Sequence, residues 1–206
     1  LRVVACNPSP MTLQGTNAHL IGKGCNRLLF DAGQGATVYI DELKDTMKKN
    51  NIGLQEILIT HWHPDHIYGI KYVLKLIDKR NFETEGAHFK AIHTPGHTTD
   101  HLCFWVEAEQ TLFPGNTILG QGTTEFEDLY DYLNSLTLAL KMSPKRIYSG
   151  YCPVVENPQQ TLEHYIFHRQ QCNNQIFDAF KQSNDGLDPN EITKIVYMGT
   201  LIILFE

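Results

Sequence analysis

The sequence predicts an α/β fold in which helices alternate with short strands and cover β-sheets. Short runs rich in branched and aromatic residues dominate the first third, and amphipathic segments of helical period lie between several strands. One continuous apolar strand runs directly into a cluster of histidines, and the carboxyl ends of such strands are where α/β layers carry their ligand sites. A chain of 206 residues is long enough for one domain with a full core, or for one domain and a small appendage.

Strands and helices are expected in a regular order along the chain. The strand-like runs are 2–5, 18–22, 27–31, 56–60, 89–92, 102–106 and 111–113. Apolar residues at helical spacing predict helices over 36–49, 69–79, 126–141 and 159–181. The run Ile57-Leu58-Ile59 is typical of a strand that is buried on both faces. We expect a main domain over 1–183 and a partial helical module over 184–206.

Composition and charge narrow the function classes. The chain is 42% hydrophobic and 19% charged, and no apolar run is long enough to cross a membrane. A formal net charge of −6 argues against a surface coated with phosphate-binding lysines, although it allows a local basic groove. Five widely spaced cysteines indicate a reducing compartment such as the cytoplasm. Both ends lie inside apolar runs, so we expect a trimmed chain.

Three imidazoles and one carboxylate follow the apolar strand within six positions. They belong to His61, His63, Asp65 and His66, and nitrogen and carboxylate oxygen are the ligands that zinc prefers in open, hydrolytic sites. In an extended loop His61 and His63 point the same way, whereas Asp65 and His66 come after a turn and face a second point. The loop is therefore expected to serve two adjacent metals. The alternative is a surface loop that is rich in histidine by chance.

This loop resembles the signature of the metallo-β-lactamase superfamily. Phe30-Asp31-Ala32-Gly33 resembles an early motif of that superfamily, in which the aspartate orients the ligand loop without binding metal; a simple turn aspartate is the alternative. Thr94-Pro95-Gly96-His97-Thr98 resembles the next motif, whose histidine completes the first zinc site. The resemblance implies a four-layer αββα sandwich and a zinc-dependent hydrolase.

Two further segments, 7–17 and 122–132, resemble a branch of the superfamily that contains a mitochondrial endoribonuclease. The branch implies single-stranded RNA as substrate, a place in the mitochondrial matrix, and a possible homodimer or larger assembly. It also puts Asn17 near the mouth of the site as a substrate-binding residue, with a backbone-capping role as the alternative. Residues 188–200 resemble the start of a winged-helix-like module that is cut short here.

The chain departs from the superfamily pattern at two metal positions. Asn116 stands where the pattern has a bridging aspartate, and its amide oxygen is a neutral ligand that compensates the repulsion between two cations less well. Tyr151 stands where the pattern has its last histidine, and we assign it to substrate binding because phenols titrate near ~10 and ligate zinc poorly. Cys152 is either a buried thiol or a replacement ligand. About thirty residues of the pattern are also missing after the predicted helix 69–79.

These residues predict one zinc ion at His61, His63 and His97, and a second site that lacks two of its groups. Asp65 is the candidate catalytic residue, because a carboxylate can orient the attacking water or accept its proton. The alternative is a catalytically degenerate member that serves as a binding or structural subunit. His101 is expected to face outward or to contact substrate, and Trp62 and Tyr68 are expected to pack in the core and at the rim.

Overall fold

A computed structural model describes residues 1–76, 88–183 and 186–197. The chain divides into two compact units, Leu1–Leu162 and Glu163–Glu206. All of the residues proposed from the sequence for the site belong to the first unit. The domain boundary expected at residue 183 stays a prediction.

The first sheet contains four strands, which are β1 (Arg2–Val4), β2 (Asn17–Ile21), β3 (Asn26–Phe30) and β4 (Gly53–Leu58). They lie side by side in chain order, and the first two pairs are antiparallel while β3 and β4 are parallel. Parallel neighbours need a crossover connection, and helix α1 (Thr37–Lys49) supplies it. This helix confirms the amphipathic segment predicted over 36–49.

The second sheet repeats this arrangement with β5 (Phe89–His93), β6 (Leu102–Val106), β7 (Thr111–Phe113) and β8 (Arg146–Ile147). Two antiparallel pairs are again followed by a parallel pair, and α4 (Leu129–Lys141) is the crossover. The helix begins three residues later than the predicted range 126–141. Asp128 caps it, because its side chain accepts a hydrogen bond from the backbone N–H of Asp131 at 2.8 Å.

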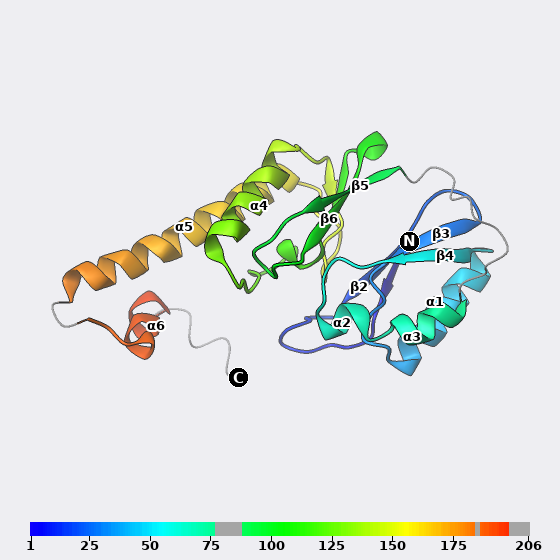
Figure 1. Ribbon diagram of the computed structural model, residues 1–206, viewed down its shortest axis with the longest axis horizontal. Coiled ribbons are helices and arrows are strands. Elements are labelled where there is room, and N and C mark those ends of the chain that lie inside the picture. The colour runs from blue at the N-terminus through cyan, green and yellow to red at the C-terminus, as the bar shows by residue number, and fades with distance from the viewer. Residues whose placement is uncertain (77–87, 184–185, 198–206) are drawn as a thin grey trace. The chain divides into compact units, whose positions relative to one another are not determined.

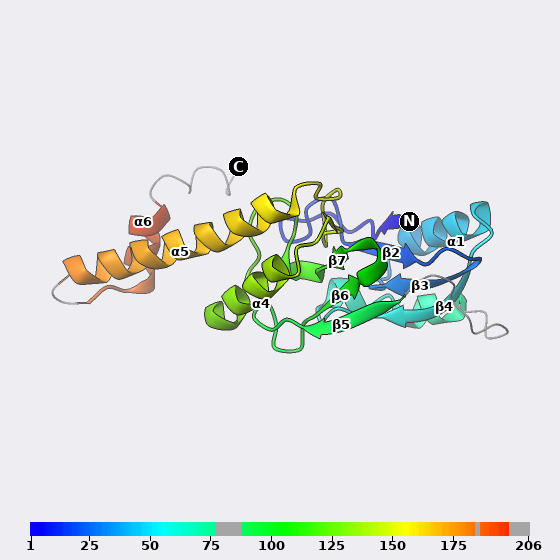
Figure 2. The same cartoon turned by 90° about the horizontal axis from the view of Figure 1, so that it is seen from above.

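The two sheets lie between helices, with α1 and α3 on one side and α4 on the other (Figures 1 and 2). Between the sheets, the ring of Phe30 on β3 lies 4.5 Å from that of Phe104 on β6 and 5.1 Å from that of Phe113 on β7. Burying each such ring contributes about 1.5–3 kcal/mol. This aromatic layer joins the sheets and confirms the predicted αββα sandwich.

After β4 the chain forms α2 (Pro64–Ile67), α3 (Ile70–Val73) and a 3-10 turn, Leu74–Leu76. The helix predicted over 69–79 is thus confirmed as far as residue 76. Its last residues, and the predicted shortening after them, lie outside the described residues. Both faces of 57–59 pack against core, as predicted, with Ile57 and Ile59 on one cluster and Leu58 on another. The three residues are only half-buried, because β4 is the edge strand of its sheet.

Helix α5 (Pro158–Gln182) starts in the first unit and continues into the second, which also contains α6 (Pro189–Tyr197). At the start of α6 the Asp188 carboxylate accepts from the N–H of Glu191 at 2.9 Å, while the Glu191 carboxylate accepts from the N–H of Asp188 at 2.9 Å. This reciprocal pair is a capping box, which explains why the helix begins here. The winged-helix-like character of this segment stays a prediction. Within the described ranges, no helix combines the length and apolarity that a membrane span requires.

Candidate metal centre

The candidate site lies where several strands of both sheets end. Asp31 follows β3, the histidine loop follows β4, Asn116 lies in a 3-10 turn after β7, and Tyr151 follows β8. The carboxyl ends of parallel neighbours meet at one edge of a sheet, so the β3–β4 and β7–β8 pairs bring these loops together. His97 joins them from the connection between β5 and β6.

Three histidines form a group that can hold one metal ion. One ring nitrogen each of His61, His63 and His97 lies within 4.8 Å of the others. The distance from His97 Nε2 to His63 Nδ1 is 3.2 Å. Tetrahedral zinc at 2.0–2.1 Å from its ligands would separate two nitrogens by about 3.4 Å, so this donor set fits the metal. The structure thus brings together the three residues that the sequence assigned to the first site.

Two of the three histidines, His61 and His97, are oriented by a hydrogen bond at Nδ1, the ring nitrogen that faces away from the shared point. His97 Nδ1 lies 2.7 Å from the carbonyl oxygen of Glu125, and His61 Nδ1 lies 2.9 Å from Thr60 Oγ1. Thr60 is itself held, because its backbone N–H and its hydroxyl donate to Asp31 Oδ1 at 2.9 and 3.0 Å. These bonds leave Nε2 of both rings for the shared point. Asp31 therefore orients the ligand loop, as the resemblance implied.

Burial sets the protonation state of these ligands. It lowers the pKa of His97 to about 4, and it also lowers the pKa of His61 and of His63. For His61, repulsion from the neighbouring imidazoles lowers the pKa further. All three rings are neutral at pH 7 as a result. Neutral imidazole is the form that binds a metal ion.

At the second position, two hydroxyl donors and one ion-paired imidazole converge on one carboxylate oxygen. Asp65 Oδ2 lies 2.7 Å from Thr16 Oγ1, 3.1 Å from the Tyr151 hydroxyl and 3.1 Å from His66 Nε2. The other nitrogen of His66 lies 2.9 Å from Asp31 Oδ2. Burial alone would lower the pKa of His66, but the two carboxylates raise it to about 10, so the ring is an imidazolium between Asp31 and Asp65.

Asn116 lies between the two positions and presents its amino group to both. Its Nδ2 donates to the Tyr151 hydroxyl at 2.7 Å and lies 3.3 Å from His61 Nε2. Its Oδ1 is buried and has no hydrogen-bond partner among the described residues. Coordination of a metal by Asn116 would need the amide to turn by half a rotation, and its role as a ligand stays a prediction.

The loop that carries Tyr151 is held by Asn17. The buried Asn17 Nδ2 donates to the carbonyl oxygens of Ser149 and Cys152, both at 3.0 Å, and the Asn17 N–H donates to that of Gly150 at 2.7 Å. Asn17 thus binds backbone, which is the alternative that the sequence left open, and its contact with substrate stays a prediction. Cys152 is a buried free thiol whose pKa is raised by burial, and it lies outside the histidine group.

Two expectations for side chains near the loop are corrected, those for His101 and Trp62. His101 is fully buried rather than outward-facing: its Nδ1 lies 3.0 Å from Thr94 Oγ1 and 3.2 Å from Thr117 Oγ1. It therefore ties the His97 loop to the Asn116 turn, a role that its position before a strand did not reveal. Trp62 is exposed rather than packed in the core, and Tyr68, expected at the rim, is exposed as well.

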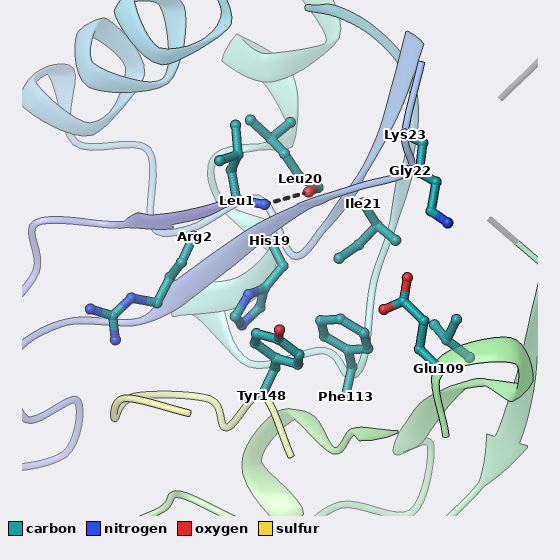
Figure 3. A pocket seen from close by; sticks show the side chains of 11 residues that line it. Leu1, Arg2, His19, Leu20, Ile21, Gly22, Lys23, Glu109, Phe113 and Tyr148 are labelled. Atoms are coloured by element: carbon teal, nitrogen blue, oxygen red, sulfur yellow. Dashed lines mark hydrogen bonds between the residues drawn. The ribbon is translucent and has the colours of Figure 1, made fainter. Parts of the chain in front are cut away.

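A separate cavity of about 280 Å³ opens between β2 and the end of β7 (Figure 3). The buried His19 ring forms part of its wall and lies edge-on to Phe113 and Tyr148, at 5.3 and 5.7 Å between ring centroids. None of the three clustered histidines lines this cavity. The metal centre and this cavity are thus different places in the first unit.

Relatives of the chain share its fold and much of its sequence. A protein of Drosophila melanogaster named "Beta-lactamase-like protein 2 homolog" is 39% identical, and the alignment covers 97% of this chain and 80% of the relative. A Caenorhabditis elegans protein of the same name is 36% identical over 95% of this chain and 75% of its own length. The Drosophila alignment spans 235 positions, so it contains gaps in this 206-residue chain. An Aspergillus fumigatus "Atrochrysone carboxyl ACP thioesterase" is 34% identical over 88% of this chain and 64% of its own length.

Solved structures give the same fold. A metallo-beta-lactamase family protein from Thermus thermophilus superposes with a TM-score of 0.74 at 17% identity, covering 96% of this chain and 87% of the other. The family profile described as "Metallo-beta-lactamase superfamily" matches residues 11–88 and 79–151, which include the histidine loop, His97 and Asn116. The chain therefore belongs to the metallo-β-lactamase superfamily.

Proposed function

We propose that this chain is a zinc-dependent hydrolase that works with one metal ion and cleaves single-stranded RNA. The observation that carries the proposal is the group formed by His61, His63 and His97, whose neutral rings are oriented toward one point. A zinc ion bound there would supply a Lewis acid and make water a nucleophile near neutral pH.

The second position supports a single metal. Asp65 accepts hydrogen bonds from the Thr16 hydroxyl and the Tyr151 phenol there, and His66 forms ion pairs with both Asp31 and Asp65. A second metal ion would have to displace the proton of His66 and the hydrogen bond of Tyr151. The residues of this position therefore fit a hydrogen-bond network better than a second zinc ion.

The residues around Asp65 keep it an ionised hydrogen-bond acceptor. The bonds from His66 and Thr16 lower the pKa of this carboxyl against the effect of burial, so it is ionised at neutral pH. Burial and the neighbouring carboxylate raise the pKa of Tyr151, so its hydroxyl remains a donor. We assign to Asp65 the orientation of the attacking water, and to Tyr151 a hydrogen bond to the substrate.

The choice of RNA depends on the resemblance of segments 7–17 and 122–132 to the RNA-cleaving branch. A mitochondrial location and self-association are proposed on the same ground. A thioester is the second candidate substrate. One relative is named a thioesterase, and acyl transfer needs less charge compensation than phosphodiester cleavage, which suits a site with one cation.

A third possibility is a binding or structural subunit without catalysis, which Asn116 and Tyr151 favour because they replace charged and imidazole groups. The test compares the parent chain with the variant His61→Ala/His63→Ala. We expect about one zinc per parent chain by elemental analysis, cleavage of a single-stranded RNA, and loss of both in the variant. Turnover that survives the double change would exclude this site as the source. Cleavage of an acyl thioester alone selects the second candidate, and absence of turnover with zinc bound selects the subunit.

A further inference from the structure

A shallow hollow of about 360 Å³ lies between the loop that follows β3 and the helical segment that follows the histidine loop. It is lined by Gln34, Gly35, Tyr68, Lys71 and Tyr72. The last three occupy positions i, i+3 and i+4 of consecutive helical turns, so they share one face. The hollow therefore combines two phenol rings, one ammonium group and one amide.

Exposed aromatic rings gather around this part of the chain. Tyr68 is 57% exposed and Tyr72 is 39% exposed, and Trp62, between two of the zinc-binding histidines, is 52% exposed. Large apolar surfaces that stay in water without a packing partner commonly mark binding sites. Tyr68 and Tyr72 both line the hollow, so it offers aromatic rings on which planar groups can stack.

The hollow is built into the fold. Gly35 has a φ of +87°, and a Cβ there would lie 3.0 Å from Tyr72 Cε2, so the absence of a side chain lets the ring lie against this loop. The Lys71 ammonium lies 4.8 Å from the centroid of the same ring. These contacts hold Tyr72 in place and put a positive charge beside it, while the ring of Tyr68 is left to solvent.

Hydrogen bonds connect the hollow to the candidate catalytic residue. Gln34 Oε1 accepts from Asn7 Nδ2 at 3.3 Å, the same Nδ2 donates to Thr16 Oγ1 at 3.1 Å, and Thr16 donates to Asp65 at 2.7 Å. Tyr68 is also fixed close to Asp65 along the chain, because its N–H donates to the carbonyl oxygen of Pro64 at 3.0 Å. The wall of the hollow is thus connected to Asp65 through Asn7 and Thr16.

We propose that this hollow is a nucleotide subsite, in which a nucleobase stacks on Tyr68 and on the part of Tyr72 that Lys71 leaves open, while Lys71 faces a backbone phosphate. The proposal depends on RNA being the substrate. Single strands are recognised in this way: aromatic side chains stack on the bases and cations follow the backbone. The amide of Gln34 can donate to and accept from the edge of a base.

The test measures binding of a fluorescein-labelled single-stranded oligoadenylate RNA to the full chain by anisotropy, with a chelator present to stop cleavage. Tyr68→Ala and Tyr72→Ala should each weaken binding about 5- to 150-fold, the range seen when one stacked base loses its partner. Tyr68→Phe and Tyr72→Phe should retain the parent affinity. Tyr130→Ala removes a tyrosine that is 75% exposed on α4 and should change nothing.

Two further measurements distinguish the contribution of the bases to binding from that of the phosphates. A strand of the same length without bases should bind weakly and equally to the parent and to both alanine variants. Lys71→Ala should reduce the dependence of log K on log salt by about 0.7, the share of one phosphate contact, whereas Lys44→Ala on α1 should not. Equal affinity of the parent and of both tyrosine-to-alanine variants for oligoadenylate would overturn the subsite.

The outcomes also separate this subsite from the proposed reaction. RNA cleavage that requires His61 and His63 but has an unchanged KM in the tyrosine variants would refute the subsite and leave the hydrolase. RNA binding that depends on the tyrosines, without cleavage that depends on His61 and His63, would support the subsite and refute the proposed hydrolase. A parent chain that binds no RNA would refute the subsite directly.

Discussion

Single residues distinguish the two positions of the candidate site. At the first position every ligand is a neutral imidazole, whereas at the second position Asn116 and Tyr151 bring hydrogen-bond donors. A donor satisfies the carboxylate of Asp65 as a cation would, but it adds no net charge. The side chains around the two positions therefore differ in charge, although the same loops carry both sets of residues.

Restoring the missing groups should restore the second metal. We expect the variant Asn116→Asp/Tyr151→His to bind two metal ions by elemental analysis, because a carboxylate and an imidazole replace two donors. Cleavage of single-stranded RNA should rise by about 100-fold or more, since a second cation stabilises charge that develops in the transition state. The control Tyr151→Phe should keep one metal ion. Two metal ions with an unchanged rate would point to a blocked substrate groove.

His19 is a second residue whose environment has a measurable consequence. Burial lowers its pKa to about 4, despite a hydrogen bond to the backbone of Ser149, while in the unfolded chain the pKa is near 6.5. The unfolded state therefore binds more protons between these values, so stability present above pH 6.5 is lost as the pH falls toward 4.

We expect His19 to account for about 2 kcal/mol of the unfolding free energy that is lost between pH 7 and pH 4.5. Denaturant unfolding at several pH values, with metal removed throughout, should show a flatter acid limb for His19→Gln than for the parent chain. His88→Gln removes an exposed histidine and should leave the acid limb unchanged. Parallel acid limbs for His19→Gln and the parent would contradict the assignment.

At the scale of elements, the start of α4 supports the His97 loop. The carbonyl oxygen of Gly96 accepts from the N–H groups of Glu127 and Asp128 at 2.7 and 3.1 Å. Gly96 has a φ of +127°, and a Cβ there would lie 2.3 Å from the backbone of Tyr132. Only glycine allows the loop to approach the helix this closely, so the helix and the metal ligand move together.

Gly96→Ala should therefore lower the free energy of unfolding by about 3 kcal/mol, through strain and overpacking, and should weaken zinc binding because His97 is displaced. The matched control is Gly122→Ala, where φ is also positive at +70° but no atom lies within 4 Å of the added carbon. It should cost only about 1 kcal/mol and leave the metal content unchanged. Similar effects of the two substitutions, in unfolding and metal titration, would show that the contact with α4 is unimportant.

The sequence predicted elements where periodicity is strong and missed what depends on neighbours. The helix over 36–49 and the strand before His61 were predicted because their apolar spacing matches one period. The half-burial of 57–59 was missed, since it follows from the edge position of β4, which local pattern does not contain. The same holds for His101, whose partners Thr94 and Thr117 meet it only in the folded chain.

The ligand residues were predictable because they belong to short motifs, whereas the network at Asp65 was not. Thr16 and Tyr151 meet that carboxylate from positions 49 and 86 residues away. No spacing rule relates such distant residues. The donors that close the second position could therefore be identified only from the fold.

At the scale of the whole molecule, metal and fold are separable. A core cluster lies between α1 and the first sheet and includes Tyr39, Leu43 and Leu54, whereas the candidate metal ligands lie in loops at the strand ends. Loops that bind a metal add stability by mass action without being needed for the core. The first unit should thus fold without metal, at a lower melting temperature.

Zinc at 100 times its dissociation constant adds about 2.7 kcal/mol to the folded state. For a chain of this size each kcal/mol shifts the melting temperature by about 2–4 °C, so a chelator should lower it by roughly 5–10 °C. Both tryptophans, exposed Trp62 and buried Trp105, lie in the first unit, so their fluorescence reports on that unit. The variant His61→Ala/His63→Ala should unfold cooperatively at a melting temperature near that of the chelated parent chain, and the chelator should not change this temperature. Loss of the cooperative transition on chelation would instead make the metal part of the core.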